Sequence, residues 1–223
     1  GFRYATQFRN GDNLAANLNY NMKSEVRDGQ SNTWYRQNWN LAAHYDHADK
    51  FMADLVLAAN GSNRSYPAKW AFSPTLALGW IYANNPETGF YGKLRASAGI
   101  QHTDYVPANG LWLEVWNGSH GEFCYGSNFA SSWGAFLTQF PTTDFRQEAA
   151  YKANIGTDIR IANSLDIVAD VFYQQRRNIL VQADALNSAV VGIQSSYDDR
   201  GVVASYGAEM GLRYAKTFAN GLN

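Results

Sequence analysis

The feature that most constrains the fold is a long alternation of apolar and polar residues that recurs along the chain. Between residues 90 and 102 the even positions are mostly apolar and the odd positions mostly polar. Residues 149–161 and 204–218 show the same separation. Because successive side chains of a β-strand point to opposite faces of the sheet, each stretch predicts a strand with one apolar and one polar face.

Weaker forms of the alternation bring the total to about nine predicted strands. These further stretches are residues 2–9, 13–22, 33–45, 51–60, 73–82 and 165–175. The predicted strands run about 9 to 13 residues, longer than is usual in globular sheets and close to what a tilted strand needs to cross a membrane. No helical period is sustained, so the predicted fold class is all-β.

The connections between these strands alternate between short and long. The short ones are residues 10–12, 46–50, 83–89 and 162–164, and the long ones are residues 23–32, 61–72, 103–147 and 176–203. In an antiparallel up-and-down meander this places every long connection at one end, as in outer-membrane barrels. A soluble β-sandwich also has an apolar and a polar face and stays an alternative.

Charged residues in the predicted strands fall on the polar face. We expect this face to line the lumen of a barrel, because Arg or Lys costs about 2 to 4 kcal/mol at a lipid-facing midplane. These side chains either pair across neighbouring strands and with a plug, or contact the transported substrate. They are Lys93, Arg95, Lys152, Asp158, Arg160, Asp166, Asp170, Glu209 and Arg213.

The chain is rich in aromatic residues, at 15% of its length, and many lie in the long connection 103–147. Such rings stack on sugar faces or on apolar side chains of a peptide, and neighbouring polar groups supply hydrogen bonds. Alternatively the rings pack against other loops or a partner lipoprotein. The candidate substrate-binding residues are Trp112, Trp116, Asn117, His120, Glu122, Tyr125 and Trp133.

Other function classes are disfavoured by composition and motifs. The formal net charge is −1, so no basic field attracts nucleic acid. His44 and His47 have an H-x-x-H spacing but fall at a strand end and in a turn, not on one helix face, so no metal site is expected. No catalytic motif is found, and we expect neither an enzyme nor a cofactor.

Several segments together resemble the SusC-type TonB-dependent transporters of Bacteroidetes outer membranes. They include Lys93 to Gln101, which reads KLRASAGIQ, and Asn154 to Asp158, which reads NIGTD. The others are residues 51–64, 72–81 and 165–181. Their order and spacing also match, and the resemblance covers about residues 33–218.

The resemblance implies that residues 1–223 are about nine strands of the C-terminal half of a 22-stranded transmembrane β-barrel, without the plug and N-terminal domains. The sequence opens on a strand and ends without a closing one, so we expect a fragment with an open sheet. The resemblance implies import with a SusD-type surface lipoprotein, and family usage favours an oligosaccharide as the cargo over an oligopeptide, which stays an alternative. Energy comes from TonB-ExbB-ExbD through the missing plug region, and the barrel contacts outer-membrane lipid.

A second function class stays open, a soluble or surface-attached β-rich carbohydrate-binding module. The two hypotheses differ in what they expect of the last predicted strand. In an incomplete barrel, Tyr206, Met210, Leu212 and Tyr214 are exposed on an unpaired edge, and the chain needs detergent. In a soluble module the first and last strands pair and these side chains are packed inside.

Overall fold

The computed structural model describes most of the chain as one long antiparallel sheet with short additional ribbons. The described residues are 1–9, 11–26, 33–65, 69–106, 111, 113–118, 122–142, 146–183 and 196–215. They contain strands, turns and irregular segments but no helix. None of them forms a helix long and apolar enough to cross a membrane.

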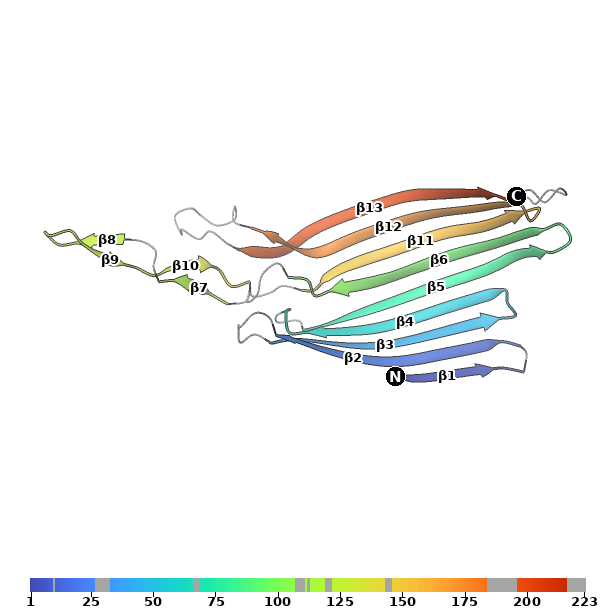
Figure 1. The fold of residues 1–223 in the computed structure, drawn as a ribbon, viewed down its shortest axis with the longest axis horizontal. Helices are drawn as coiled ribbons and strands as arrows, with labels where there is room; N and C mark the ends of the chain where they lie inside the picture. The colour runs from blue at the N-terminus through green and yellow to red at the C-terminus, as the bar shows by residue number, and fades with distance from the viewer. Residues whose placement is uncertain are drawn as a thin grey trace.

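The main sheet has nine strands in the order β1-β2-β3-β4-β5-β6-β11-β12-β13, so neighbours in sequence are neighbours in the sheet (Figure 1). Each pair is antiparallel. The strands are β1 (Phe2–Gln7), β2 (Asn13–Val26), β3 (Thr33–His47), β4 (Phe51–Ser62), β5 (Trp70–Asn85), β6 (Phe90–Thr103), β11 (Glu148–Ile161), β12 (Leu165–Gln182) and β13 (Tyr197–Tyr214).

Tight turns join the strands at one end of the sheet and the longer connections lie at the other (Figure 1). Ala48, Asp49, Ala162 and Asn163 have positive φ values between 51° and 53° in two of the tight turns. Left-handed backbone of this kind reverses the chain within a few residues. The two ends are called the short-turn end and the long-connection end below.

The connection between β6 and β11 forms an arm that extends beyond the long-connection end of the sheet (Figure 1). The arm contains two two-stranded ribbons, one pairing β7 with β10 and the other β8 with β9. Their strands are β7 (Val115–Asn117), β8 (Glu122–Tyr125), β9 (Ala130–Trp133) and β10 (Phe136–Gln139).

The fold class, the strand order and the alternation of connection lengths agree with the sequence-based prediction, but several boundaries differ. The last strand runs from 197 to 214 rather than from 204 to 218, and residues 216–218 lie outside the described part. Strand β12 continues to Gln182 rather than ending at 175. Register shifts near Ile179 interrupt the period of two, so the alternation stops although the pairing continues.

The short strands of the arm were not predicted. Each has only three or four residues, which is too short for an alternation to be recognised. The sequence therefore indicated a long connection where the structure has two ribbons.

The sheet is open in the described part of the chain. Strand β1 pairs only with β2, and β13 pairs only with β12. Tyr206, Met210, Leu212 and Tyr214 are 82%, 69%, 62% and 66% exposed, as the incomplete-barrel hypothesis predicts. The edge strands consequently present unpaired backbone N–H and C=O groups.

The main sheet is a single layer with no packed core of its own. Leu111 and Ala149 are the only buried hydrophobic residues among those described. The strands are held by their backbone ladders and by contacts between neighbouring side chains on each face. Small residues allow some of these contacts, since a Cβ on Gly92 would lie 2.3 Å from Cζ of Tyr82.

We expect Gly92→Ala to destabilise the sheet by about 1 to 3 kcal/mol, because the added methyl group displaces the Tyr82 ring. Gly211→Ala is the matched control, since a Cβ there meets no atom within 4 Å, and its effect is expected to stay within about 0.5 kcal/mol. Urea unfolding of the purified protein measures both. Equal stability of the two variants would contradict the close packing of Tyr82 on β6.

Candidate functional site

The strand registers place all nine charged residues predicted to line a lumen on one face of the sheet. Lys93 lies opposite Asp158 across β6 and β11. Asp166 lies opposite Arg213, and Asp170 opposite Glu209, across β12 and β13. Directly opposed residues of an antiparallel pair point to the same side. We call this side the polar face and the other the apolar face.

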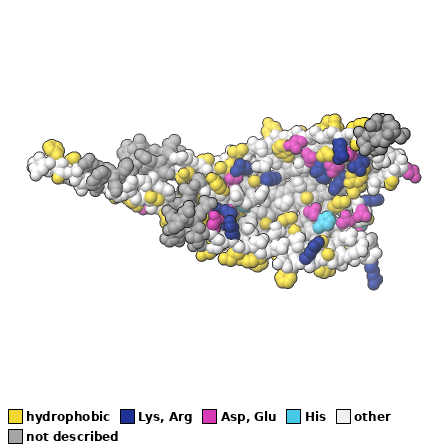
Figure 2. All heavy atoms as spheres, in the orientation of Figure 1, with side chains coloured by type: hydrophobic (Ala, Val, Ile, Leu, Met, Phe, Trp, Pro, Cys, Tyr) yellow, Lys and Arg dark blue, Asp and Glu magenta, His cyan; other side chains and the backbone are white. Residues whose placement is uncertain are grey.

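Several of these charged residues form ion pairs with one another near the short-turn end. The Nη2 atom of Arg95 lies 3.0 Å from Oδ1 of Asp158 and 3.0 Å from Oδ2 of Asp170. Arg160 donates from Nε to Oδ1 of Asp166 at 2.6 Å. The guanidinium of Arg95 therefore links a carboxylate of β11 with one of β12. Figure 2 shows charged side chains gathered on this part of the polar face.

Toward the long-connection end the polar face becomes a hollow of about 790 Å³, and about half of its lining residues have uncharged polar side chains. In Figure 2 the middle of this face is mostly uncoloured, in contrast to the charged part. The hollow spans strands from β3 to β12. Its amide side chains on the polar face are Asn38, Asn60, Gln101, Asn154 and Gln174.

Some of these amides have partners and others do not. Asn60 donates from Nδ2 to Oγ of Ser73 at 3.2 Å. Gln101 accepts a hydrogen bond from Nζ of Lys152 at 2.8 Å. Within the described part of the chain, the side chains of Asn38, Asn154 and Gln174 make no hydrogen bond, so their donors and acceptors are available to a ligand.

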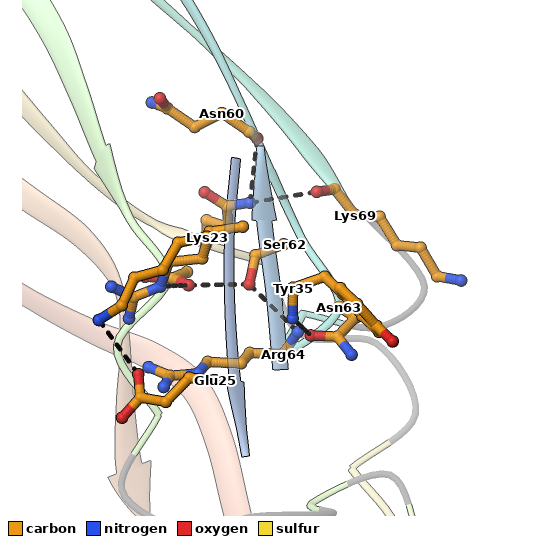
Figure 3. A network of polar contacts seen from close by, with 11 residues as sticks. Lys23, Glu25, Tyr35, Asn60, Ser62, Asn63, Arg64 and Lys69 are labelled. Carbon is orange, nitrogen blue, oxygen red and sulfur yellow. Dashed lines mark hydrogen bonds and ion pairs between the residues drawn. The ribbon is translucent and has the colours of Figure 1, made fainter. Parts of the chain in front are cut away.

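A polar network at the rim fixes both ends of the connection between β6 and β11. Directly after β6, the carboxylate of Asp104 accepts hydrogen bonds from Nε of Arg36 at 2.6 Å and from Oγ of Ser62 at 2.8 Å. Directly before β11, Gln147 donates to the backbone oxygens of Asn60 and Lys69, each at 3.4 Å. Figure 3 shows this network around Ser62. The connection therefore starts and ends against the rim of the hollow.

The predicted substrate-binding residues lie on the arm rather than in the hollow. Trp116 and Asn117 belong to β7, where Trp116 is 59% exposed and donates from Nε1 to Oε2 of Glu114 at 3.3 Å. Glu122 and Tyr125 belong to β8, and Glu122 lies opposite Trp133 of β9.

Two more of the predicted substrate-binding residues, Trp112 and His120, lie outside the described residues. The structure thus brings the described members of this set onto the two ribbons. It does not gather them around one cavity.

The amides of the hollow are functional candidates that the sequence reasoning did not single out. The alternation already assigned polar residues to one face, but only the charged ones were predicted as candidates. Counting Asn and Gln at those positions would have indicated an amide-rich wall. What the sequence alone did not give is the register that sets Asn38 opposite Asn60, and Ser97 opposite Asn154.

The two histidines with H-x-x-H spacing contact different acidic residues. His44 contacts Asp54 on β4 through Nδ1 at 2.6 Å, and His47 contacts Asp12 through Nδ1 at 2.8 Å. Asp12 also accepts a hydrogen bond from the Tyr45 hydroxyl at 2.6 Å. No group of three His, Cys, Asp or Glu side chains in the described ranges could hold a metal ion.

Aromatic residues on the apolar face lie toward both ends of the sheet. Toward the long-connection end, Tyr20 lies opposite Trp39 with ring centroids 4.5 Å apart. Toward the short-turn end, Phe51 stacks on Trp80 with centroids 5.9 Å apart. These residues belong to two aromatic bands, one toward each end. The band toward the long-connection end also contains Trp70, Phe72, Tyr151, Tyr173 and Tyr206, and the band toward the short-turn end also contains Tyr45 and Tyr214.

Aliphatic residues fill the apolar face between these two bands. Leu76 and Leu78 lie between Phe72 and Trp80 on β5, and all four are at least 45% exposed. A separation of eight positions corresponds to about 27 Å along a strand. If the strand is tilted by 35° to 45° from the barrel axis, the height of this segment along the axis is about 19 to 22 Å. This is close to the apolar band of about 25 Å between aromatic girdles in outer-membrane barrels.

Comparison with known proteins finds similarity at the level of structure. No family profile and no curated protein matches the sequence. A structure described as the RagAB peptide transporter superposes with a TM-score of 0.75 at 11% identity, over 95% of this chain and 26% of that one. Structures of the RagAB peptide importer superpose with TM-scores of 0.75 in the closed-closed state and 0.73 in the open-open state, each at 12% identity.

This similarity establishes the fold of the sheet. The chain covers about a quarter of the length of those solved structures, 26% in each case. The nine-stranded open meander is thus an arrangement that occurs as one part of a larger chain.

We expect Arg95→Met to lower the free energy of unfolding by about 1 to 2 kcal/mol, because Asp158 and Asp170 lose the cation that they share. Adding Asp170→Asn should restore part of the loss by removing one carboxylate. Arg200→Met is the control, because its pair with Asp198 is highly exposed on the arginine side at 76%, so the effect should stay below about 0.5 kcal/mol. Urea unfolding that fails to separate Arg95 from Arg200 would contradict a structural role for this cluster.

Proposed function

We propose that this chain is part of a SusC-type nutrient importer of the bacterial outer membrane. The observation that carries the proposal is the division of a single-layered sheet into an apolar face with two aromatic bands and a polar face with paired charges and amides. In a membrane barrel the first face meets lipid and the second lines the passage for the cargo. The protein acts as a transporter rather than as an enzyme.

The unpaired edges of the sheet fit this proposal. Lipid offers no hydrogen-bond partners to backbone groups, so a membrane-embedded sheet has to close. β1 and β13 do not pair with each other in the described chain. Further strands must therefore pair with both edges, which agrees with the 22-stranded barrel that the sequence resemblance implies.

The arm and the rim suggest where partners act. A SusD-type lipoprotein on the cell surface would meet the long-connection end, where Trp116 of the arm and Tyr105 near its base are 59% and 69% exposed. Exposed aromatic side chains of this kind are common anchors of protein interfaces. TonB-ExbB-ExbD would supply energy through the plug region of the whole transporter.

The cargo is an oligomer small enough to enter the lumen, either an oligopeptide or an oligosaccharide. The similar structures are those of a peptide transporter, and this supports an oligopeptide. The SusC-type resemblance also fits a glycan. Both cargoes carry many neutral hydrogen-bonding groups, which suits a wall of amides.

The lipid-facing assignment predicts opposite responses at two adjacent residues of β11. Ile155 is on the apolar face and 67% exposed, and Asn154 is on the polar face. In lipid vesicles, Ile155→Arg should destabilise the assembled barrel by about 2 to 4 kcal/mol, because the charge enters the bilayer. Asn154→Arg should change stability by less than about 1 kcal/mol.

A soluble carbohydrate-binding module would behave differently. There Ile155 is already in water, so an arginine at this position costs little. Unfolding titrations of both variants in vesicles, together with the need for detergent to keep the protein in solution, separate the two functions. Equal stability of the two variants would argue against the outer-membrane assignment.

The import function itself is tested in cells that express the full-length gene with its native flanking sequence. We expect uptake of fluorescent oligomers, from a panel of mixed peptides and neutral glycans, to be lost when the gene is deleted and to depend on an active TonB system. The surface lipoprotein should co-purify with the importer. Undiminished uptake of every oligomer in the deletion strain would contradict the function.

A further inference from the structure

The hollow on the polar face combines neutral amides with one cation that has no acidic partner. Lys152 of β11 donates to the neutral amide of Gln101 at 2.8 Å. Among the described residues no carboxylate oxygen lies within 4.0 Å of its Nζ atom. The side chain is exposed to the hollow, and its charge is available to an incoming anion.

The acidic residues nearest in the sheet are already committed to arginines. Glu148, on the same strand as Lys152, pairs with Arg176 at 2.5 Å. Asp104 at the rim pairs with Arg36 at 2.6 Å. Lys152 therefore differs from Arg36, the arginine that lines the hollow. Arg36 has a carboxylate partner, and Lys152 has none among the described residues.

The amides around Lys152 are suited to an extended chain of peptide groups. Gln174 lies opposite Lys152 across β11 and β12, through the register that pairs these two positions. Asn154 is the next polar-face residue along β11. Each side-chain amide offers one acceptor and a pair of donor hydrogens, which complements the C=O and N–H of a peptide group.

The hollow favours a neutral sugar less than it favours a peptide. Phe172 is the only aromatic residue on its polar-face lining in the described part of the chain, and its ring lies against Gly207 of the neighbouring strand. Among these residues, a sugar could stack only on the partly exposed ring of Phe172. A neutral glycan would also leave the charge of Lys152 without a partner, whereas every unmodified oligopeptide carries a terminal carboxylate.

We propose that this hollow binds the C-terminal segment of an oligopeptide, with the terminal carboxylate on Lys152 and the preceding peptide groups on the amides of Asn154 and Gln174. The volume of about 790 Å³ lies within the range of small-ligand pockets, which suits a short segment. The proposal rests on the import function above and narrows its cargo to peptides with a free carboxyl end.

The test compares two forms of one probe on the purified full-length protein. The probe is a mixed library of hexapeptides with uncharged side chains, prepared once with free C-termini and once as C-terminal amides. Binding is measured by competition against a fluorescent member of the library. We expect the free-acid library to bind about tenfold more tightly than the amide library, as a charge-assisted hydrogen bond provides. Lys152→Met should remove this preference by weakening only the acid form, and Lys152→Arg should retain most of it.

Lys50→Met is the matched control, because Lys50 lies in a tight turn at the short-turn end, away from the hollow. Its preference for the acid library should equal that of the unmodified protein. Equal binding of the two libraries, or a preference that survives Lys152→Met, would overturn the proposal.

The outcomes also distinguish this proposal from the import function. Uptake of glycans with no binding of peptides overturns the peptide site and leaves the import function standing. Tighter binding of acidic oligosaccharides than of free-acid peptides also overturns the assignment of the ligand. Absence of any oligomer uptake that depends on the gene, together with absence of oligomer binding by the purified protein, contradicts both.

Discussion

The backbone ladder is the constraint on which the rest of the structure depends. With only Leu111 and Ala149 buried as hydrophobic residues in the described part, the sheet has no interior whose packing could hold it together. The strands instead rely on uninterrupted antiparallel pairing across the meander. Such a ladder is strongest where water cannot compete for its hydrogen bonds, so an apolar solvent on one face stabilises the arrangement.

Because the pleat sends alternate residues to opposite sides, each strand has to satisfy two environments at once. The apolar face carries aliphatic residues between aromatic bands. The polar face is graded along the strand direction, with ion pairs around Arg95 near the short-turn end and neutral amides toward the long-connection end. The ion pairs around Arg95 are therefore separated from the amides along the strands, while two further ion pairs, Arg36 with Asp104 and Arg176 with Glu148, lie near the rim of the hollow.

Much of this organisation could be predicted from the sequence because its period equals the period of the strand. The alternation from 90 to 102 identified β6, its faces and the placement of Lys93 and Arg95 without any tertiary information. Prediction weakened where pairing departs from regular geometry. Register shifts near Ile179 interrupt the alternation, so the last residue pairs between β12 and β13 were not predicted. The strands of the arm are too short to show a period.

The candidate site was harder to predict because it depends on which strands are neighbours in space. Gln101 and Lys152 are far apart in sequence and meet only through the pairing of β6 with β11. The contact of Asp104 with Arg36 joins segments that are not adjacent in the sheet. No period in the sequence encodes such a contact, since it arises from the curvature of the sheet and the path of a long connection.

The contact between Asp104 and Arg36 also determines how the arm is mechanically coupled to the wall. The arm leaves the sheet at the end of β6, but its first residues are tied to β3 and β4 through Arg36 and Ser62. A force that tilts the arm is therefore divided between the strand that carries it and a distant part of the same wall. The arm is thus anchored at two places on the rim of the hollow, the end of β6 and strands β3 and β4.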